Sequence, residues 1–257
     1  MEGIMEQPFW ANGPKPGSFY DFHAGHSSKT TTVMPVKHTQ YPMVTGSSVI
    51  GIQFDGGVMI AADKLGSYGS LARYRNCSRI LKVNNTTIMG AGGDYADFQF
   101  LRDIVEQRVI DEECLDDGFN YTPRSLFSWL TRVLYNRRSR FNPLWNTVLV
   151  GGLQDGEPFL GYVDKIGTAY QSPTAASGFG AYIALPMLRE AYERNDKMSE
   201  DEAKTLLESC LRVLYYRDCR AWNKYDIAIV THDGSRLEES KTLSTDWSTA
   251  DMVSGYE

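Results

Sequence analysis

The order of strand-like and helix-like segments constrains the fold of this chain more than any other feature. Two hairpin patterns are followed by two amphipathic helix patterns, further strands, two more helices and a last strand. These segments begin, in chain order, at Ser48, Arg79, Asp94, Thr122, Thr147, Gly180, Ser199 and Asp226. Since each sheet and each helix pair has an apolar face to bury, the order predicts an α+β fold, a four-layer α-β-β-α sandwich.

The helix patterns carry their own start signals. Asp94 and Thr122 are typical N-cap residues, Pro123 suits a first helical position, and Ser199 to Glu202 reads as a capping box. The apolar residues expected to face the core recur at i, i+3 and i+4. They are Phe98, Leu101, Ile104, Val105 and Val109; Leu126, Trp129, Leu130, Val133 and Leu134; Ile183, Met187, Leu188 and Ala191; and Ala203, Leu206, Leu207, Cys210, Leu211 and Leu214.

Both ends of the chain lack such patterns. Residues 1 to about 45 are rich in Gly, Pro, Ser, Thr and His, which predicts an extension without a core of its own, either disordered or removed. After the last strand, Leu243–Glu257 carries a few apolar side chains spread through polar residues. That composition builds no core but suits pockets on a partner.

Composition excludes several classes of function. The net charge of −6 lacks the electrostatic footprint of a nucleic-acid binder, and the basic run Arg132–Arg140 reads as a solvated helix end. No apolar run approaches the roughly 20 residues that span a bilayer, so we expect no membrane partner. Four cysteines without a C-x-x-C pair indicate reduced thiols in an intracellular protein, and we expect neither a metal nor a cofactor.

Four short motifs stand in order along the chain: Gly46–Val49, Ile60–Asp63, Gly90–Asp94 and Tyr216–Asp218. Together they resemble proteasome beta subunits. Four further stretches resemble noncatalytic members of that family: Thr39–Gly46, Ser67–Ser70, Asn142–Thr147 and Leu214–Asp218. The resemblance implies the N-terminal-nucleophile hydrolase fold. It also implies assembly with other alpha and beta subunits into a hetero-oligomeric barrel of four stacked seven-membered rings.

The family's active members attack the peptide bond with an N-terminal threonine whose freed α-amine serves as the base. The resemblance aligns Ser47 with that nucleophile. It also places Asp63 at the family's aspartate, Gly93 at its oxyanion glycine and Asp218 at its supporting aspartate. Five positions depart from the active pattern: Ser47 itself, Leu65, Arg79, Phe179 and Ala221.

The departures predict a site without catalysis. Arg79 stands where active members have lysine, and a guanidinium with a pKa above about 12 cannot shuttle protons. Phe179 and Ala221 replace supporting serines. If maturation stops at Thr39, the nitrogen of Ser47 stays an amide and lacks the basic lone pair of an α-amine, whose pKa is about 7.7–8.0. Asp63 and Arg79 then read most simply as a structural pair.

The resemblance also divides the chain. Residues 1–38 are expected to be a propeptide, cut between His38 and Thr39 by an active neighbour, and 39–46 an N-terminal extension of the mature chain. Residues 47–240 form the beta-type domain, and 241–257 a tail that contacts neighbouring subunits. The tail residues expected at that interface are Trp247, Met252 and Tyr256.

The predicted function is a noncatalytic structural and assembly subunit of the 20S proteasome core, in cytoplasm and nucleus, that supports ATP- and ubiquitin-dependent protein degradation. The alternative is an active N-terminal serine hydrolase released by cleavage after Gly46. A third hypothesis is a stand-alone peptide-binding protein on an inactive hydrolase fold. The mature N-terminus and the oligomeric state discriminate among the three.

Overall fold

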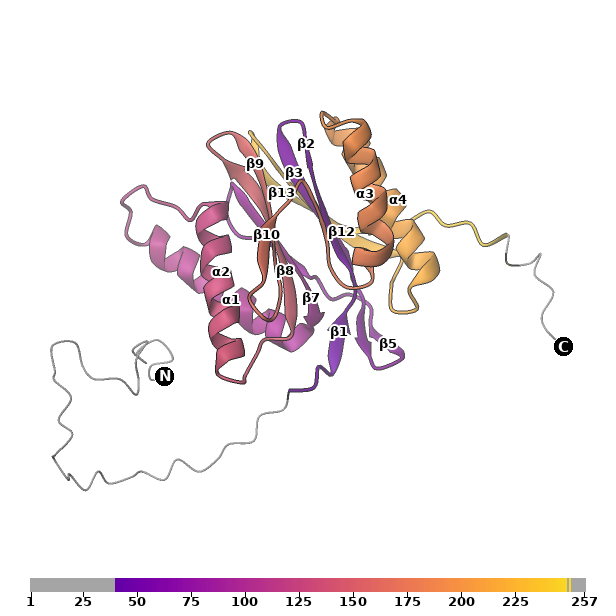
Figure 1. Ribbon diagram of the computed structural model, residues 1–257, viewed down its shortest axis with the longest axis horizontal. Helices are drawn as coiled ribbons and strands as arrows, with labels where there is room; N and C mark the ends of the chain where they lie inside the picture. The colour runs from indigo at the N-terminus through magenta and orange to yellow at the C-terminus, as the bar shows by residue number, and fades with distance from the viewer. Residues whose placement is uncertain (1–39, 249, 251–257) are drawn as a thin grey trace, which may run out of the picture. The chain divides into compact units, whose positions relative to one another are not determined.

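Two antiparallel sheets stack face to face and each is covered on its outer side by two helices (Figure 1). The structure is a computed structural model that describes residues 40–248 and residue 250. This architecture confirms the predicted α+β four-layer sandwich. The helices are α1 (Tyr95–Glu113), α2 (Pro123–Ser139), α3 (Gly180–Arg194) and α4 (Glu200–Arg217).

The first sheet has the strand order β10-β9-β8-β7-β1-β4-β5, with β6 paired to β7. Its strands are β1 (Val44–Gly46), β4 (Gly66–Tyr68), β5 (Leu71–Tyr74), β6 (Ile80–Lys82), β7 (Thr87–Asp94), β8 (Asn146–Gln154), β9 (Glu157–Val163) and β10 (Ala169–Gln171). The second sheet has the order β11-β2-β3-β12-β13. Its strands are β2 (Val49–Phe54), β3 (Gly57–Asp63), β11 (Thr174–Ala176), β12 (Lys224–Thr231) and β13 (Gly234–Thr242).

The helix starts follow the predicted local chemistry. Asp94 accepts a hydrogen bond from the Asp97 amide at 3.0 Å, and Thr122 caps α2 with Pro123 in its first turn. Both halves of the capping box at the start of α4 are formed. Each such cap satisfies backbone donors that the first helical turn would otherwise leave unpaired.

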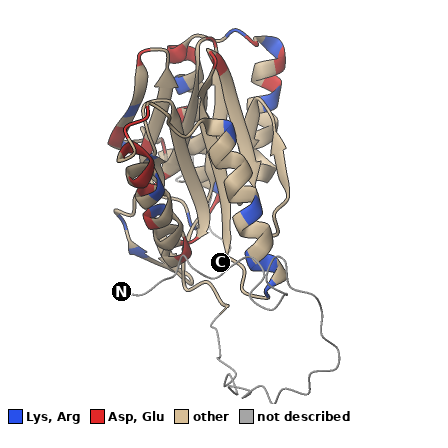
Figure 2. Ribbon diagram, turned by 90° about the vertical axis from the view of Figure 1, so that its left-hand side faces the viewer, with Lys and Arg blue, Asp and Glu red and all other residues tan. Residues whose placement is uncertain are grey.

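The basic run of the sequence lies mostly in the last two turns of α2 and just beyond its end. Arg137 and Arg138 occupy the last turn, where cations face the negative end of the helix dipole. On this side of the fold, shown in Figure 2, α1 carries Asp and Glu together with Arg, whereas the charged residues of α2 are all arginines. Among the described residues, no helix is long and apolar enough to cross a membrane.

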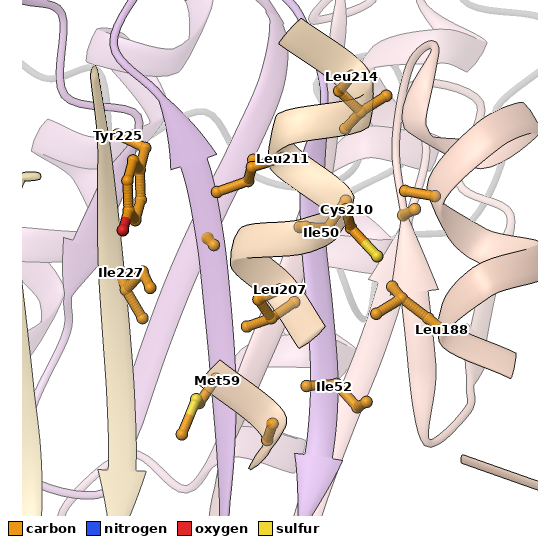
Figure 3. Packing of buried hydrophobic residues seen from close by; sticks show 14 of the residues in the cluster. Ile50, Ile52, Met59, Leu188, Leu207, Cys210, Leu211, Leu214, Tyr225 and Ile227 are labelled. Atoms are coloured by element: carbon orange, nitrogen blue, oxygen red, sulfur yellow. The ribbon is translucent and has the colours of Figure 1, made fainter. Parts of the chain in front are cut away.

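Three apolar clusters separate the four layers. One lies between the first sheet and α1 and α2, one between the two sheets, and one between the second sheet and α3 and α4 (Figure 3). In the last, Leu207, Cys210 and Leu211 of α4 pack over Ile50 and Ile52 of β2. Each fully buried aliphatic side chain contributes about 1.5–3 kcal/mol, so these clusters hold the sheets in fixed register.

The predicted inward face of α4 is largely confirmed, whereas that of α3 is partly wrong. In α3, Ala184 and Leu185 are buried together with Leu188, while Ile183 and Met187 are only half-buried. The sequence runs Ile183-Ala184-Leu185, so the apolar residues alone leave the rotation of the helix open. Packing of α3 against α4 and β11 decides it.

The sequence patterns missed five strands: β1, β4, β5, β11 and β13. The interpretation of residues 1 to about 45 as an extension outside the core is wrong for β1, because Val44–Gly46 pairs on both sides inside the first sheet. Strands of three or four residues are too short to show a period of two. β13 is a largely polar edge strand, which lacks the apolar alternation used for prediction.

Candidate active site

The segment before Ser47 forms an interior strand of the first sheet. β1 pairs antiparallel with β4 on one side and with β7 on the other, so Thr45 lies opposite both Ser67 and Asp94. Gly46 lies opposite Gly93 at the end of β7. Ser47 then links β1 of the first sheet to β2 of the second. The chain itself therefore covers the edge of β7 next to Gly93.

The Ser47 hydroxyl donates a hydrogen bond to the carboxylate of Asp218. Asp218 is the C-cap residue of α4, and its other carboxylate oxygen accepts from the Arg220 amide at 2.9 Å. Ala221 donates its amide to the Asp218 carbonyl at 3.1 Å. The turn after α4 thus brings a carboxylate to Ser47, but Ala221 brings no hydroxyl.

Arg79 is the central side chain of the site and is almost completely buried, with 2% of its surface exposed. Its Nε donates to the Asp63 carbonyl at 3.1 Å, and its two terminal nitrogens donate to the carbonyls of Ser47 and Ser48 at 3.0 Å each. Arg79 also forms an ion pair with the Asp63 carboxylate. A guanidinium suits this position because its planar fork can serve several acceptors at once.

Gly46 is required by the position of Arg79. A Cβ at residue 46 would overlap the aliphatic part of the Arg79 side chain. The arginine therefore fills the space directly beside the peptide bond that precedes Ser47. This packing ties the strand β1 to the buried ion pair.

Burial raises the pKa of Asp63 from 3.8 to about 6, and the attraction of Arg79 opposes that shift only in part. The negative charge of Asp218 adds a smaller contribution in the same direction as burial. At neutral pH the Asp63 carboxylate is still mostly ionised. It is a charged partner for Arg79 rather than a free base.

Gly93 has φ +98° and a Cβ at this residue would overlap the Trp145 carbonyl oxygen, so only glycine fits. Its amide lies at the point where β1 pairs with β7. The backbone geometry alone therefore requires glycine at position 93. Gly93 needs no catalytic role to be present.

Two serines that the sequence analysis did not single out hold the start of β2. The Ser48 hydroxyl accepts from the Gly180 amide at 2.8 Å, and the Ser177 hydroxyl accepts from the Val49 amide at 3.0 Å. Phe179, between these contacts, is 41% exposed and provides no side-chain cap for α3. Spacing in the sequence gave no signal for either serine, because the contacts join segments more than a hundred residues apart.

The structure brings together Ser47, Asp63, Arg79, Gly93 and Asp218, with Ala221 next to Asp218. Leu65 is buried and Phe179 faces outward. Among the described residues, no group of His, Cys, Asp and Glu side chains could hold a metal ion. The predicted cut between His38 and Thr39, and the tail residues Met252 and Tyr256, lie outside the described residues.

The tail residue Trp247 packs on its own chain. Its ring makes edge contacts with Tyr215 and Tyr216 of α4, with ring centroids 5.8 and 4.9 Å apart, and half of its surface stays exposed. The Tyr216 hydroxyl accepts from the Asp246 amide at 2.7 Å. The interface role of Trp247 stays a prediction.

The four-layer sandwich, with Ser47 at the junction of its two sheets, defines the N-terminal-nucleophile hydrolase class of fold. The chain belongs to the proteasome subunit family, whose model, described as proteasome subunit, matches residues 43–230.

Similar proteins narrow the family further. The chain is 55% identical to proteasome subunit beta type-4 of Xenopus laevis over 247 residues. The match covers 96% of this chain and 99% of that protein. It is 41% identical to proteasome subunit beta type-4 of Drosophila melanogaster, over 98% of this chain and 97% of that protein. It is also 40% identical to proteasome subunit beta type-7 of Saccharomyces cerevisiae, over 86% of this chain and 87% of that protein.

Proposed function

We propose that this chain is a noncatalytic beta-type subunit of the 20S proteasome core, which builds the particle without cutting peptides. The observation that carries the proposal is the strand β1. It runs without interruption into Ser47 and pairs on both sides, with Ser67 of β4 and with Gly93 of β7. In the chain with β1 in place, the Ser47 nitrogen is an amide, so Ser47 carries no α-amine that could act as its base.

The chemistry around Ser47 supports a threonine-protease-like site that has lost its proton-transfer groups. Ser47 donates its hydrogen bond to Asp218, and the cation beside it is Arg79. The Asp218 carboxylate accepts this hydrogen bond, and it is not the neighbouring α-amine that serves as the base in active members. Arginine stays protonated and can give only fixed positive charge. These groups suit a structural role, in which their hydrogen bonds fix the segment that connects the two sheets.

The proposal extends to partners and place. The similarity to subunits named beta type-4 and beta type-7 supports assembly with other alpha and beta subunits. We propose a barrel of four seven-membered rings with this chain at the seventh beta position, in cytoplasm and nucleus. There it would support ATP- and ubiquitin-dependent degradation by the complex.

We further propose the maturation predicted from the sequence. Residues 1–38 are removed by an active neighbour and residues 39–46 remain, because β1 needs residues 44–46 to fill its place between β4 and β7. Residues 47–240 make the domain, and the tail 241–257 reaches a neighbouring subunit through Trp247, Met252 and Tyr256.

Replacing the cellular copy with Ser47→Ala tests the noncatalytic role. The purified particle is expected to contain the variant at normal stoichiometry and to keep every peptidase activity of the parent, since only one hydrogen bond, worth about 1 kcal/mol, is lost. Loss of one peptidase activity in a fully assembled particle would contradict the proposal. Labelling of Ser47 by a serine-directed fluorophosphonate would favour the alternative, an active serine hydrolase.

A further inference from the structure

The hairpin of β4 and β5 forms the end of the first sheet, on the side of β1 (Figure 1). Within the described part of the chain, β5 pairs with β4 alone. The main-chain N–H and C=O groups on its outer edge therefore have no partner strand. An unpaired strand edge of this kind can accept a further strand from another chain.

This edge exposes large apolar side chains. Leu71 is 58% exposed, and Tyr68 and Tyr74 are 42% exposed each. All three lie on a hairpin of only two short strands. Several exposed apolar side chains on one hairpin indicate an interaction surface, whereas single exposed apolar side chains are normal on any protein.

The same edge is strongly cationic. The Arg73 guanidinium lies 5.5 Å from the Tyr68 ring and 5.4 Å from the Tyr74 ring, and Arg75 lies 4.7 Å from the Trp222 ring. Neither arginine has a carboxylate partner among the ion pairs of the described residues. Residues 64–93 contain no Asp or Glu at all, although the chain as a whole carries a net charge of −6.

We propose that this hairpin surface, made of Tyr68, Leu71, Arg73, Tyr74, Arg75 and Trp222, docks an acidic extended segment of a neighbouring subunit. The segment adds a strand to the outer edge of β5, which supplies main-chain hydrogen bonds. Carboxylates of the segment pair with Arg73 and Arg75, and its apolar side chains pack on Leu71 and the tyrosines. The inference rests on the proposed function, because it takes the partner from the assembled particle.

Charge complementarity decides among the occupants. If two copies of this chain paired edge to edge, each would bring its own Arg73 and Arg75 to the same place, and the like charges would repel. A nucleic acid would satisfy the arginines but leave the unpaired N–H and C=O groups of β5 without a strand. An acidic extended peptide satisfies the cations, the apolar side chains and the sheet edge together.

A photo-crosslinker placed at residue 71 tests the docking. The chain with benzoylphenylalanine at this position is assembled in cells, the particle is purified and irradiated, and the crosslinked peptide is sequenced by mass spectrometry. The expected product joins residue 71 to a segment of another subunit that contains Asp or Glu within a few residues of the crosslink. Arg73→Glu with Arg75→Glu is expected to lower the crosslink yield at least about tenfold.

Two further variants make the result specific. Arg73→Gln with Arg75→Gln removes the charges without adding new ones. This variant should also lower the crosslink yield. Arg102→Glu with Arg194→Glu is the matched charge reversal on helices away from the hairpin, and it should leave the yield unchanged.

Crosslinking of residue 71 to a segment without acidic residues, to nucleic acid, or to a second copy of this chain would overturn the inference. So would an undiminished yield in both arginine double variants. Those outcomes leave the proposed function intact, since the chain is present in the particle. Absence of the unsubstituted chain from the purified particle would instead overturn both.

Discussion

At the scale of single residues, the buried pair of Asp63 and Arg79 organises the region around Ser47. Arg79 holds the main-chain carbonyls of Ser47 and Ser48, and it packs against the backbone of Gly46. These contacts join β1, β2 and β3 at one point. Asp63 and Arg79, which the resemblance aligns with catalytic positions of the family, are here explained by what they hold together.

Arg79→Ala is expected to lower the free energy of unfolding by about 3–5 kcal/mol, because it leaves buried carbonyls without donors and Asp63 without its counter-charge. Urea unfolding of the purified chain measures the change. Arg102→Ala is the control, since that side chain is 35% exposed and its ion pairs are on the surface; we expect a change within about 1 kcal/mol. An Arg79→Ala effect as small as that of the control would show that the arginine does not organise the site.

The raised pKa of Asp63 predicts a pH dependence. Its folded-state pKa of about 6 lies above the ordinary value of 3.8, so between these values the folded chain binds a proton that the unfolded chain does not. This contribution to stability is present in full below about pH 3.8 and is lost as the pH rises through 6.

Asp63→Asn removes this titration. The free energy of unfolding of the parent, measured relative to the variant, should therefore fall by about 2 kcal/mol from pH 4 to pH 7. Urea unfolding at several pH values provides both numbers. A difference that stays constant, or that grows with pH, would contradict the assignment of a raised pKa to Asp63.

At the scale of elements, β1 occupies the place between β4 and β7 next to the residues around Ser47. It is only three residues long, yet it joins β4 to β7 inside the first sheet. Without it, the β4–β5 hairpin would lose its connection to the rest of the sheet. The residues before Ser47 thus serve the fold.

Thr45→Pro is expected to detach β1, because proline donates no hydrogen bond and does not fit an interior strand. Thr45 is paired on both sides, with Ser67 and Asp94. In hydrogen-exchange mass spectrometry, peptides containing Ser67 and Gly93 should exchange at least about tenfold faster. Tyr41→Pro, at an exposed position outside β1, is the matched control. Equal exchange in the two variants would mean that β1 does not hold this edge.

The sequence predicted the helices and the apolar strands well, but it missed four short strands and the long, largely polar β13. The N-caps Asp94, Thr122 and Ser199 bond to residues only three positions further on, so a local sequence pattern can predict them. β1 and the contacts of Ser48 and Ser177 depend on segments far apart in sequence, and no local pattern encodes them. The aligned positions Asp63, Arg79 and Asp218 came from the family resemblance, and their geometry could come only from the structure.

At the scale of the whole molecule, the sandwich of the family is present whatever chemistry its site performs. The three apolar clusters depend on sheet and helix faces and not on Ser47. A family whose members assemble into a common particle needs each subunit to keep that sandwich. Surfaces such as the β4–β5 hairpin can then diverge for particular neighbours.

The intact mass of this subunit, taken from the purified mature particle, tests the central claim most directly. A chain that begins at Thr39 keeps β1, leaves the Ser47 nitrogen as an amide and fits a structural subunit without catalysis. This is the result that we predict. A chain that begins at Ser47 would mean that the Gly46–Ser47 bond is cut and the α-amine is free, which would contradict the account and restore the serine hydrolase.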